Sequence, residues 1–202
     1  MSDLDTIAVQ DMKHELCEYW CGNDCPVTRV TPSIYVGTYE KYNNGSIAGK
    51  WLNLLDYAGA EEFFEACKEL HKNENDPEFM AQDFEGYPKE FYEESMSFDN
   101  IQAIYSYLAL EDEDRELLEE YCEATGENIN SEQDIEDIRD KLFCILDYTH
   151  SNDDENAMAD YVIENGLIDV PTDLQYYIDY YKLGQSYLEN MSVSSNGYVF
   201  TN

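Results

Sequence analysis

The spacing of apolar and polar residues in the first half of the chain predicts a small sheet with one packed helix. Residues 33–39 are rich in β-branched and aromatic side chains and predict a strand. The Asn-Asn-Gly sequence at 43–45 is a strong turn signal, which predicts a hairpin that returns as a strand over 48–55. Apolar residues at helical spacing predict a helix over 61–71, and a second apolar run predicts a strand over 79–84.

From residue 97 onward the apolar spacing becomes helical. One helix is predicted through 101–108, and a second through 117–122 with Gly126 as its C-cap. Ser131 and Asp134 have the spacing of a capping box and predict a third short helix. The apolar run 142–146 fits either a strand or the end of that helix.

The last fifty residues predict two further helices and a terminal hairpin. Residues 152–164 are amphipathic and stop before Gly166. Thr172 and Gln175 resemble a capping box that opens a tyrosine-rich helix through Tyr181. An Asn-Gly turn lies between short β-type runs within 191–200. These elements predict an α+β fold of two to three small units, preceded by a polar N-terminal extension over residues 1–32.

The charge of the chain is extreme for a protein with so many core-forming residues. Forty-five Asp and Glu stand against eleven Lys and Arg, which gives a formal charge of −34. Hydrophobic residues make up 43% and aromatic residues 14%, including eighteen Tyr, whereas disordered acidic segments are poor in aromatics. The composition therefore predicts a folded polyanion. Such a surface repels nucleic acid and anionic membranes, so its expected partner is a basic surface or a cation.

The N-terminus and the apolar segments predict a cytoplasmic protein. The first five residues are acidic and lack the basic and apolar regions of a signal peptide. No stretch approaches the ~20 apolar residues that a membrane span needs.

Three of the six cysteines have a spacing that raises the question of a metal site. Cys17, Cys21 and Cys25 form C-x3-C-x3-C and follow His14. Zinc sites normally add a second ligand pair some distance away, and this chain has none unless His14 and Cys17 serve. We expect reduced thiols and no bound metal here, with zinc as the alternative. The other three, Cys67, Cys122 and Cys144, fall in apolar segments and are expected to be small buried hydrophobes.

Catalytic signals are weak throughout the sequence. The run 45–50 is one residue short of a phosphate-binding loop and has Trp51 where that motif needs Ser or Thr. Carboxylate pairs are so frequent that none singles out a general acid and base. We therefore expect no enzyme, no catalytic residue and no cofactor.

The acidic residues are densest between 111 and 160, where nineteen Asp and Glu accompany three Lys and Arg. Within 116–123 the apolar spacing predicts that Leu117, Leu118, Tyr121 and Cys122 face inward and Glu116, Glu119, Glu120 and Glu123 outward. Like charges at these spacings destabilise a helix, so helix stability does not explain the arrangement. B-DNA carries one charge per ~1.7 Å of axis, so 34 charges equal the phosphates of roughly 58 Å of duplex, about 17 base pairs.

Six segments spread over the chain carry a resemblance to a known family: 34–36, 41–45 with Gly49 and Trp51, 62–70, 83–88, 177–180 with Gly184, and 197–200. They are similar to the ArdA antirestriction proteins of plasmids, transposons and phages. The resemblance runs from about Ser33 to the C-terminus, and the extension over 1–32 departs from the family.

The resemblance implies a function that fits the charge. ArdA proteins are elongated DNA mimics of three small α/β units that dimerise through the C-terminal unit and occupy the DNA-binding groove of type I restriction-modification enzymes. The corresponding units here would be 33–95, 96–140 and 141–202. The expected partner is the groove of the specificity and methyltransferase subunits, with no nucleic acid and no membrane bound.

The family has no catalytic residues to transfer, and its acidic surface acts collectively. Twelve positions are expected to contribute to partner binding: Asp112, Glu113, Asp114, Glu116, Glu119, Glu120, Glu123, Asp134, Glu136, Asp137, Asp153 and Asp154. Tyr176, Tyr177 and Tyr181 are expected at a homodimer contact, because aromatics are enriched in interface cores. The alternative function is an acidic adaptor that sequesters another basic DNA-binding protein.

Overall fold

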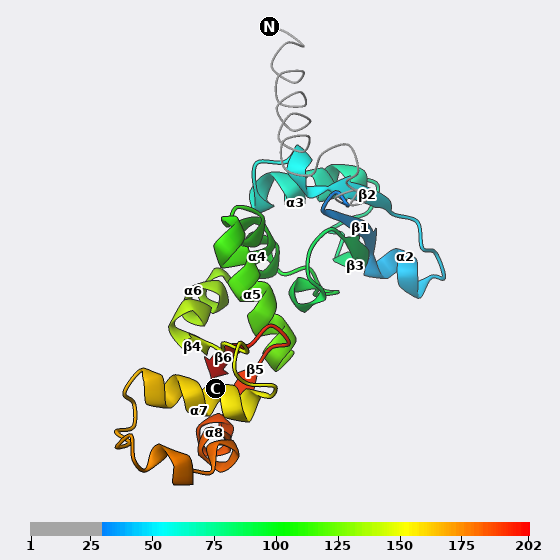
Figure 1. The fold of residues 1–202 in the computed structure, drawn as a ribbon. Coiled ribbons are helices and arrows are strands. Elements are labelled where there is room, and N and C mark those ends of the chain that lie inside the picture. Colours follow the sequence, from blue (N-terminus) through cyan, green and yellow to red (C-terminus); the bar gives the residue numbers. More distant parts are fainter. Residues whose placement is uncertain (1–29) are drawn as a thin grey trace, which may run out of the picture. The chain divides into compact units, whose positions relative to one another are not determined.

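The computed structural model describes residues 30–202, and these form an α+β fold as expected (Figure 1). This part of the chain contains seven α-helices and two three-stranded antiparallel sheets. All but its first two residues belong to one compact unit, Pro32–Asn202. Nearly all of the 1–32 extension, with His14 and the three N-terminal cysteines, lies outside the described residues.

The first sheet contains the strands that the sequence predicts. Strand β1 (Ser33–Thr38) lies between β2 (Lys50–Asn53) and β3 (Phe79–Glu85) and pairs with both in antiparallel register. Helix α3 (Ala60–Leu70) buries Phe63 and Cys67. Its side chains join those of Ile34 and Val36 in one core, as the alternation in β1 requires.

The connection between β1 and β2 is not the tight turn that we expected. The chain forms a short helix, α2 (Tyr39–Asn43), because the Thr38 side chain accepts a hydrogen bond from the Lys41 backbone and caps it. Asn44 then ends the helix, and Gly45 takes the left-handed φ of 80°. The hairpin pairing is correct, but the Asn-Gly pair ends a helix and does not itself reverse the chain.

The central helices agree with the sequence. Helix α4 (Phe98–Leu108) is capped by Ser97, and α5 (Asp112–Thr125) ends at Gly126 with a left-handed φ of 67°. Helix α6 (Glu132–Lys141) begins with the expected capping box of Ser131 and Asp134. Three-residue 3-10 helices, at Leu54–Asp56 (η2) and Lys89–Phe91 (η3), complete this half of the fold.

The second sheet is formed by residues far apart in sequence. Strand β4 (Leu142–Ile145) pairs with β6 (Tyr198–Thr201), which also pairs with β5 (Met191–Val193). The run 142–146 is therefore a strand and not the end of α6. The turn between β5 and β6 contains the predicted Asn-Gly pair, with Gly197 at φ 83°.

Two helices complete the C-terminal part, and the second begins later than predicted. Helix α7 (Asp154–Glu164) packs against α8 (Tyr180–Leu188) (Figure 1). The predicted capping box at Thr172 is wrong, because the following residues form only the 3-10 helix Gln175–Tyr177 (η4). Asp179 caps α8 instead, by accepting a hydrogen bond from the Lys182 backbone.

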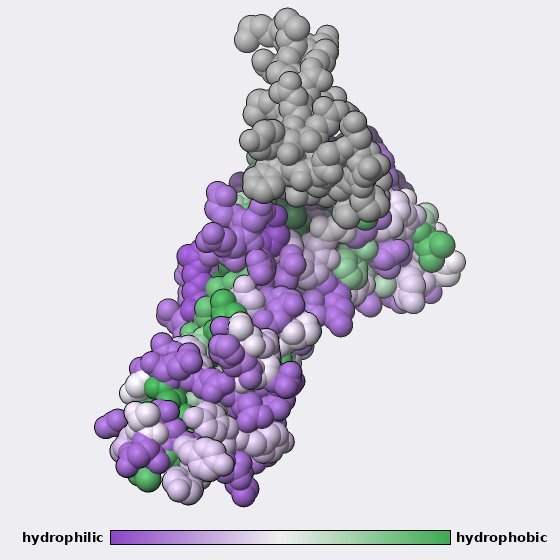
Figure 2. Space-filling view, in the orientation of Figure 1, coloured by the Kyte–Doolittle hydropathy of each residue, from purple (hydrophilic) through white to green (hydrophobic). Residues whose placement is uncertain are grey.

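The buried side chains form two clusters that meet at the C-terminal strand. The larger extends from Ile34 to Ile138 and includes Phe200, whose ring lies edge-on to Tyr121 at 5.2 Å. The smaller lies under α7 and includes Met158 and Val199. Hydrophilic side chains cover most of the face seen in Figure 2, with small separate apolar patches. The boundaries of the three expected units, at residues 95 and 140, stay a prediction.

Candidate protein-binding surface formed by carboxylates

The surface of residues 30–202 is dominated by carboxylates without a cationic partner. This part of the chain has 39 Asp and Glu and nine Lys and Arg, and 29 of the carboxylates are exposed. Eight of the nine cations form an ion pair with one carboxylate each, which leaves 31 carboxylates with no Lys or Arg partner among residues 30–202. The negative charge is therefore presented to solvent and is not cancelled internally.

Most of the twelve predicted acidic residues lie at the surface. Seven are exposed and four are half-buried, the latter being Asp114, Asp134, Asp153 and Asp154. Glu120 contradicts the prediction, because its exposed fraction is only 7%. The spacing in α5 places it on the outer face of the helix, but the β5–β6 turn covers that position.

Three carboxylates of α5 hold this turn. They accept hydrogen bonds from two side chains of the turn and from the first residue of β6: Asn196 Nδ2 to Glu120 (2.6 Å), Ser195 Oγ to Glu123 (3.1 Å), and Tyr198 OH to Glu116 (3.0 Å). The backbone N–H of Ser195 also donates to Glu123, at 3.3 Å. These contacts join residues more than seventy positions apart in sequence, so no local pattern could have shown them.

Other tyrosines donate to carboxylates elsewhere on this surface. Tyr107 OH lies 2.6 Å from Glu119 Oε1, and Tyr148 OH lies 2.7 Å from Asp154 Oδ1. Beyond the twelve predicted residues, Tyr39 donates to Glu94 at 3.1 Å, and Tyr121 donates to Glu127. The sequence signal for these pairs is the high tyrosine content. Composition alone does not show which tyrosine contacts which carboxylate.

Backbone and amide groups hold three more of the predicted carboxylates. Asp134 accepts from the backbone N–H groups of Asn130 and Ser131, both at 2.9 Å, and Asp153 accepts from the Asn156 backbone at 2.8 Å. Both residues stand at helix N-termini, where anions are favoured. Asp137 accepts from Gln133 Nε2 at 2.7 Å.

Within the described part of the chain, Lys and Arg pair with two of the twelve. Arg115 Nη1 lies 3.3 Å from Asp112 Oδ1, and Arg139 pairs with Asp114. No side-chain partner is present for Glu113 or Glu136 among residues 30–202. Eight of the twelve thus accept from neutral donors, which hold a carboxylate in place and leave its charge intact.

The pKa shifts of the tyrosines agree with this arrangement. Burial, followed by the hydrogen bond and charge of Glu119, raises the pKa of Tyr107. The same causes, with Glu116 and Asp154 as the respective carboxylates, raise the pKa of Tyr198 and of Tyr148. These phenols are therefore protonated donors at neutral pH.

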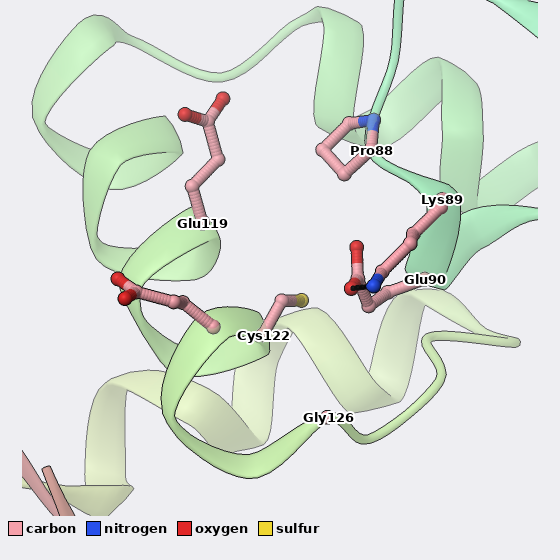
Figure 3. Close-up of a pocket in the computed structure, with 7 residues that line it drawn as sticks. Pro88, Lys89, Glu90, Glu119, Cys122 and Gly126 are labelled. Carbon is pink, nitrogen blue, oxygen red and sulfur yellow. Dashed lines mark ion pairs between the residues drawn. The ribbon is translucent and has the colours of Figure 1, made fainter. Parts of the chain in front are cut away.

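A shallow pocket of about 350 Å³ lies beside the acidic helix (Figure 3). Glu119, Cys122 and Glu123 line it from α5, and residues 88–90 line it from the opposite side. Burial raises the pKa of the Cys122 thiol to about 12, so this thiol is protonated and is not an activated nucleophile. The pocket thus offers carboxylates and an inert thiol.

The three described cysteines are buried and unpaired, as expected of Cys67, Cys122 and Cys144. No group of three His, Cys, Asp or Glu suited to a metal ion occurs within residues 30–202. The metal question at Cys17, Cys21 and Cys25 falls outside that range. In the same range, no helix is long and apolar enough to cross a membrane.

The three tyrosines expected at a dimer contact are exposed. Tyr176 and Tyr177 are 91% and 80% exposed and lie edge-on at 5.7 Å, while Tyr181 is 46% exposed. They lie at the beginning of α8 and in the segment before it. Their role in a dimer stays a prediction.

Residues 30–202 thus form a folded polyanion, in which eight of the twelve candidate carboxylates accept hydrogen bonds from neutral donors. Comparison with known families places the chain in a protein family. Residues 34–200 match the family model described as antirestriction protein (ArdA). The chain therefore belongs to the ArdA antirestriction family, as its sequence segments indicated. No curated protein matches the chain.

Proposed function

We propose that this protein mimics DNA and inhibits type I restriction-modification enzymes by occupying their DNA-binding groove. The observation that carries the proposal is the set of 31 carboxylates without a cationic partner on a folded body, in a chain of the ArdA family. A basic groove binds DNA mainly through phosphates, and the same groove attracts any ordered array of negative charges.

The proposed partner surface is the groove of the specificity and methyltransferase subunits, and the proposed location is the bacterial cytoplasm, where these enzymes meet invading DNA. Eleven of the twelve candidate carboxylates reach the surface and would face Lys and Arg of the groove. Glu120 is left out because it is buried. Binding would involve no catalytic step and no cofactor.

We further propose that the protein acts as a homodimer through the exposed tyrosines beside α8. Tyr176, Tyr177 and Tyr181 supply exposed aromatic area, and Leu174 beside them is also exposed. Two copies would double the length of DNA that the charge can imitate.

Inhibition kinetics test the proposal. A type I enzyme is assayed for DNA cleavage and for methylation at several DNA concentrations, with and without this protein. We expect the inhibition to be overcome by added DNA, because both ligands compete for one groove. Inhibition that does not change with DNA concentration would contradict mimicry. Equally tight binding to an unrelated basic DNA-binding protein would favour the adaptor function.

A further inference from the structure

Three tyrosines on different elements hold carboxylates of the proposed binding surface. Tyr107 of α4 donates to Glu119, Tyr198 of β6 donates to Glu116, and Tyr148 of the loop after β4 donates to Asp154. Tyr198 lies 82 positions from Glu116, and Tyr107 lies 12 positions from Glu119 on the neighbouring helix. Tyr148 lies six positions before Asp154, in the loop that precedes α7. In each pair, donor and acceptor belong to different elements.

The tyrosine rings are anchored while their hydroxyl groups reach the surface. The Tyr107 residue is 5% exposed and belongs to the main core, and the ring of Tyr198 stacks on Phe200 at 6.4 Å. The ring of Tyr148 covers Gly197, where an added Cβ would lie 2.8 Å from it. A ring fixed in this way offers a hydroxyl at a defined position, because Tyr has an apolar body and a polar end.

A neutral donor has an advantage over a cation on this surface. An Arg or Lys partner also orders a carboxylate, but it cancels the charge that the groove would recognise. A phenol hydroxyl orders the carboxylate and leaves its full charge, since the phenol stays protonated at neutral pH.

We propose that Tyr107, Tyr148 and Tyr198 are positioning residues of the DNA-mimicking surface, which fix Glu119, Asp154 and Glu116 in place without neutralising them. This inference rests on the proposed function. It assigns a role in binding to residues that do not themselves carry charge.

The size of the effect follows from the ordering of side chains on binding. A carboxylate released from its tyrosine must be ordered when the complex forms, and each such side chain costs about two- to twelvefold in affinity. Removing all three hydroxyl groups should therefore weaken binding by about tenfold or more.

The experiment compares two triple variants with the same chemical change. The first replaces the three positioning tyrosines by Phe. The matched control replaces three tyrosines whose hydroxyl groups donate to backbone carbonyls: Tyr35 to Ile47 (3.2 Å), Tyr92 to Ala81 (2.8 Å), and Tyr105 to Leu54 (2.9 Å). The control loses four hydrogen bonds, because Tyr35 OH also accepts from the Gly49 backbone N–H at 3.2 Å, but it frees no carboxylate. Neither triple variant changes the formal charge.

The readouts are affinity for a type I enzyme, the salt dependence of that affinity, and the melting temperature. We expect about tenfold weaker binding for the first variant, less than threefold for the control, and a salt dependence equal to that of the wild type. A third variant, E116Q, E119Q and D154N combined, should lower the salt dependence because it removes charge. If the first variant fails to fold, Tyr148→Phe alone should still weaken binding at least twofold.

Equal weakening in the two tyrosine variants would overturn the inference, because it would show a structural role only. Unchanged affinity in the first variant would also overturn it. Failure of the wild type to bind the enzyme is a separate result, which would reject the proposed function and this inference with it.

Discussion

Replacing Gly184 by Ala should separate the two C-terminal helices. Gly184 lies within α8, and a Cβ at this position would lie 1.7 Å from the backbone carbonyl oxygen of Glu155 in α7. Cβ contacts below 3.0 Å are essentially absent from proteins, so the helices would have to move apart by about 1.3 Å. A gap of that size removes a large part of the dispersion attraction between the packed side chains.

The expected change in the free energy of unfolding has two parts, a loss from overpacking and a smaller gain from the higher helix propensity of alanine. Overpacking a well-packed site costs about 1–3 kcal/mol or more, and a rigid backbone obstacle favours the upper end. Alanine in a helix gains about 1 kcal/mol over glycine. The net loss of unfolding free energy should be about 2 kcal/mol, which lowers the urea midpoint by about 1 M when the m-value is near 2 kcal/mol/M.

Urea unfolding followed by far-UV circular dichroism measures this loss. Gly59→Ala is the control, because an added Cβ there meets nothing within 4 Å and the backbone at φ 170° is extended. We expect the midpoint of the control to stay within about 0.3 M of the wild type. A midpoint for G184A equal to or above that of the wild type would refute the close approach of α7 and α8.

Three other properties follow from the structure. Added NaCl should raise the melting temperature, because it screens repulsion in a chain of charge −34. Sucrose at equal osmolarity is the control, and it should not reproduce the rise in melting temperature that NaCl gives. Hydrogen bonds from Ser95 and Ser97 to Glu93, and from Tyr121 to Glu127, lower the pKa of each carboxyl below the usual 4.5. The two ionised carboxylates therefore stabilise the fold above pH 4.5, and this part of the free energy of unfolding is lost as the pH falls through the lowered pKa values. Acid titration of the free energy of unfolding should show this loss in the wild type, and the E93Q and E127Q variants should each lack their part of it. Replacing Tyr176 and Tyr177 by Ser should shift sedimentation from dimer toward monomer, and an unchanged dimer would exclude these residues from the contact.

Local patterns predicted most of the elements because their signals act within a few residues. The capping box of Ser131 and Asp134, and the left-handed Gly126 after α5, are examples. Helix α2 was missed because its one local cap, Thr38, is a weaker signal than the Asn-Gly pair, and its other contacts involve partners distant in sequence. Lys41 pairs with Glu74 at 2.7 Å and lies 2.7 Å from Nδ1 of the buried His71.

The acidic surface was predictable as a composition but not as an arrangement. Helical spacing placed Glu116, Glu120 and Glu123 on one outer face, and the structure shows that the β5–β6 turn lies over this face and buries Glu120. Periodicity describes one helix at a time, whereas these contacts depend on residues at 195–198. For the same reason Tyr198 could not be paired with Glu116 before the fold was known.

The central claim is that this protein and DNA compete for one groove, and displacement of bound DNA tests it most directly. A fluorescently labelled duplex is bound to a type I restriction-modification enzyme, and this protein is added in increasing amounts while anisotropy is recorded. We predict that the duplex is fully released at excess protein, and that more protein is needed when more duplex is present. Duplex that stays bound when the enzyme is saturated with this protein would contradict the claim.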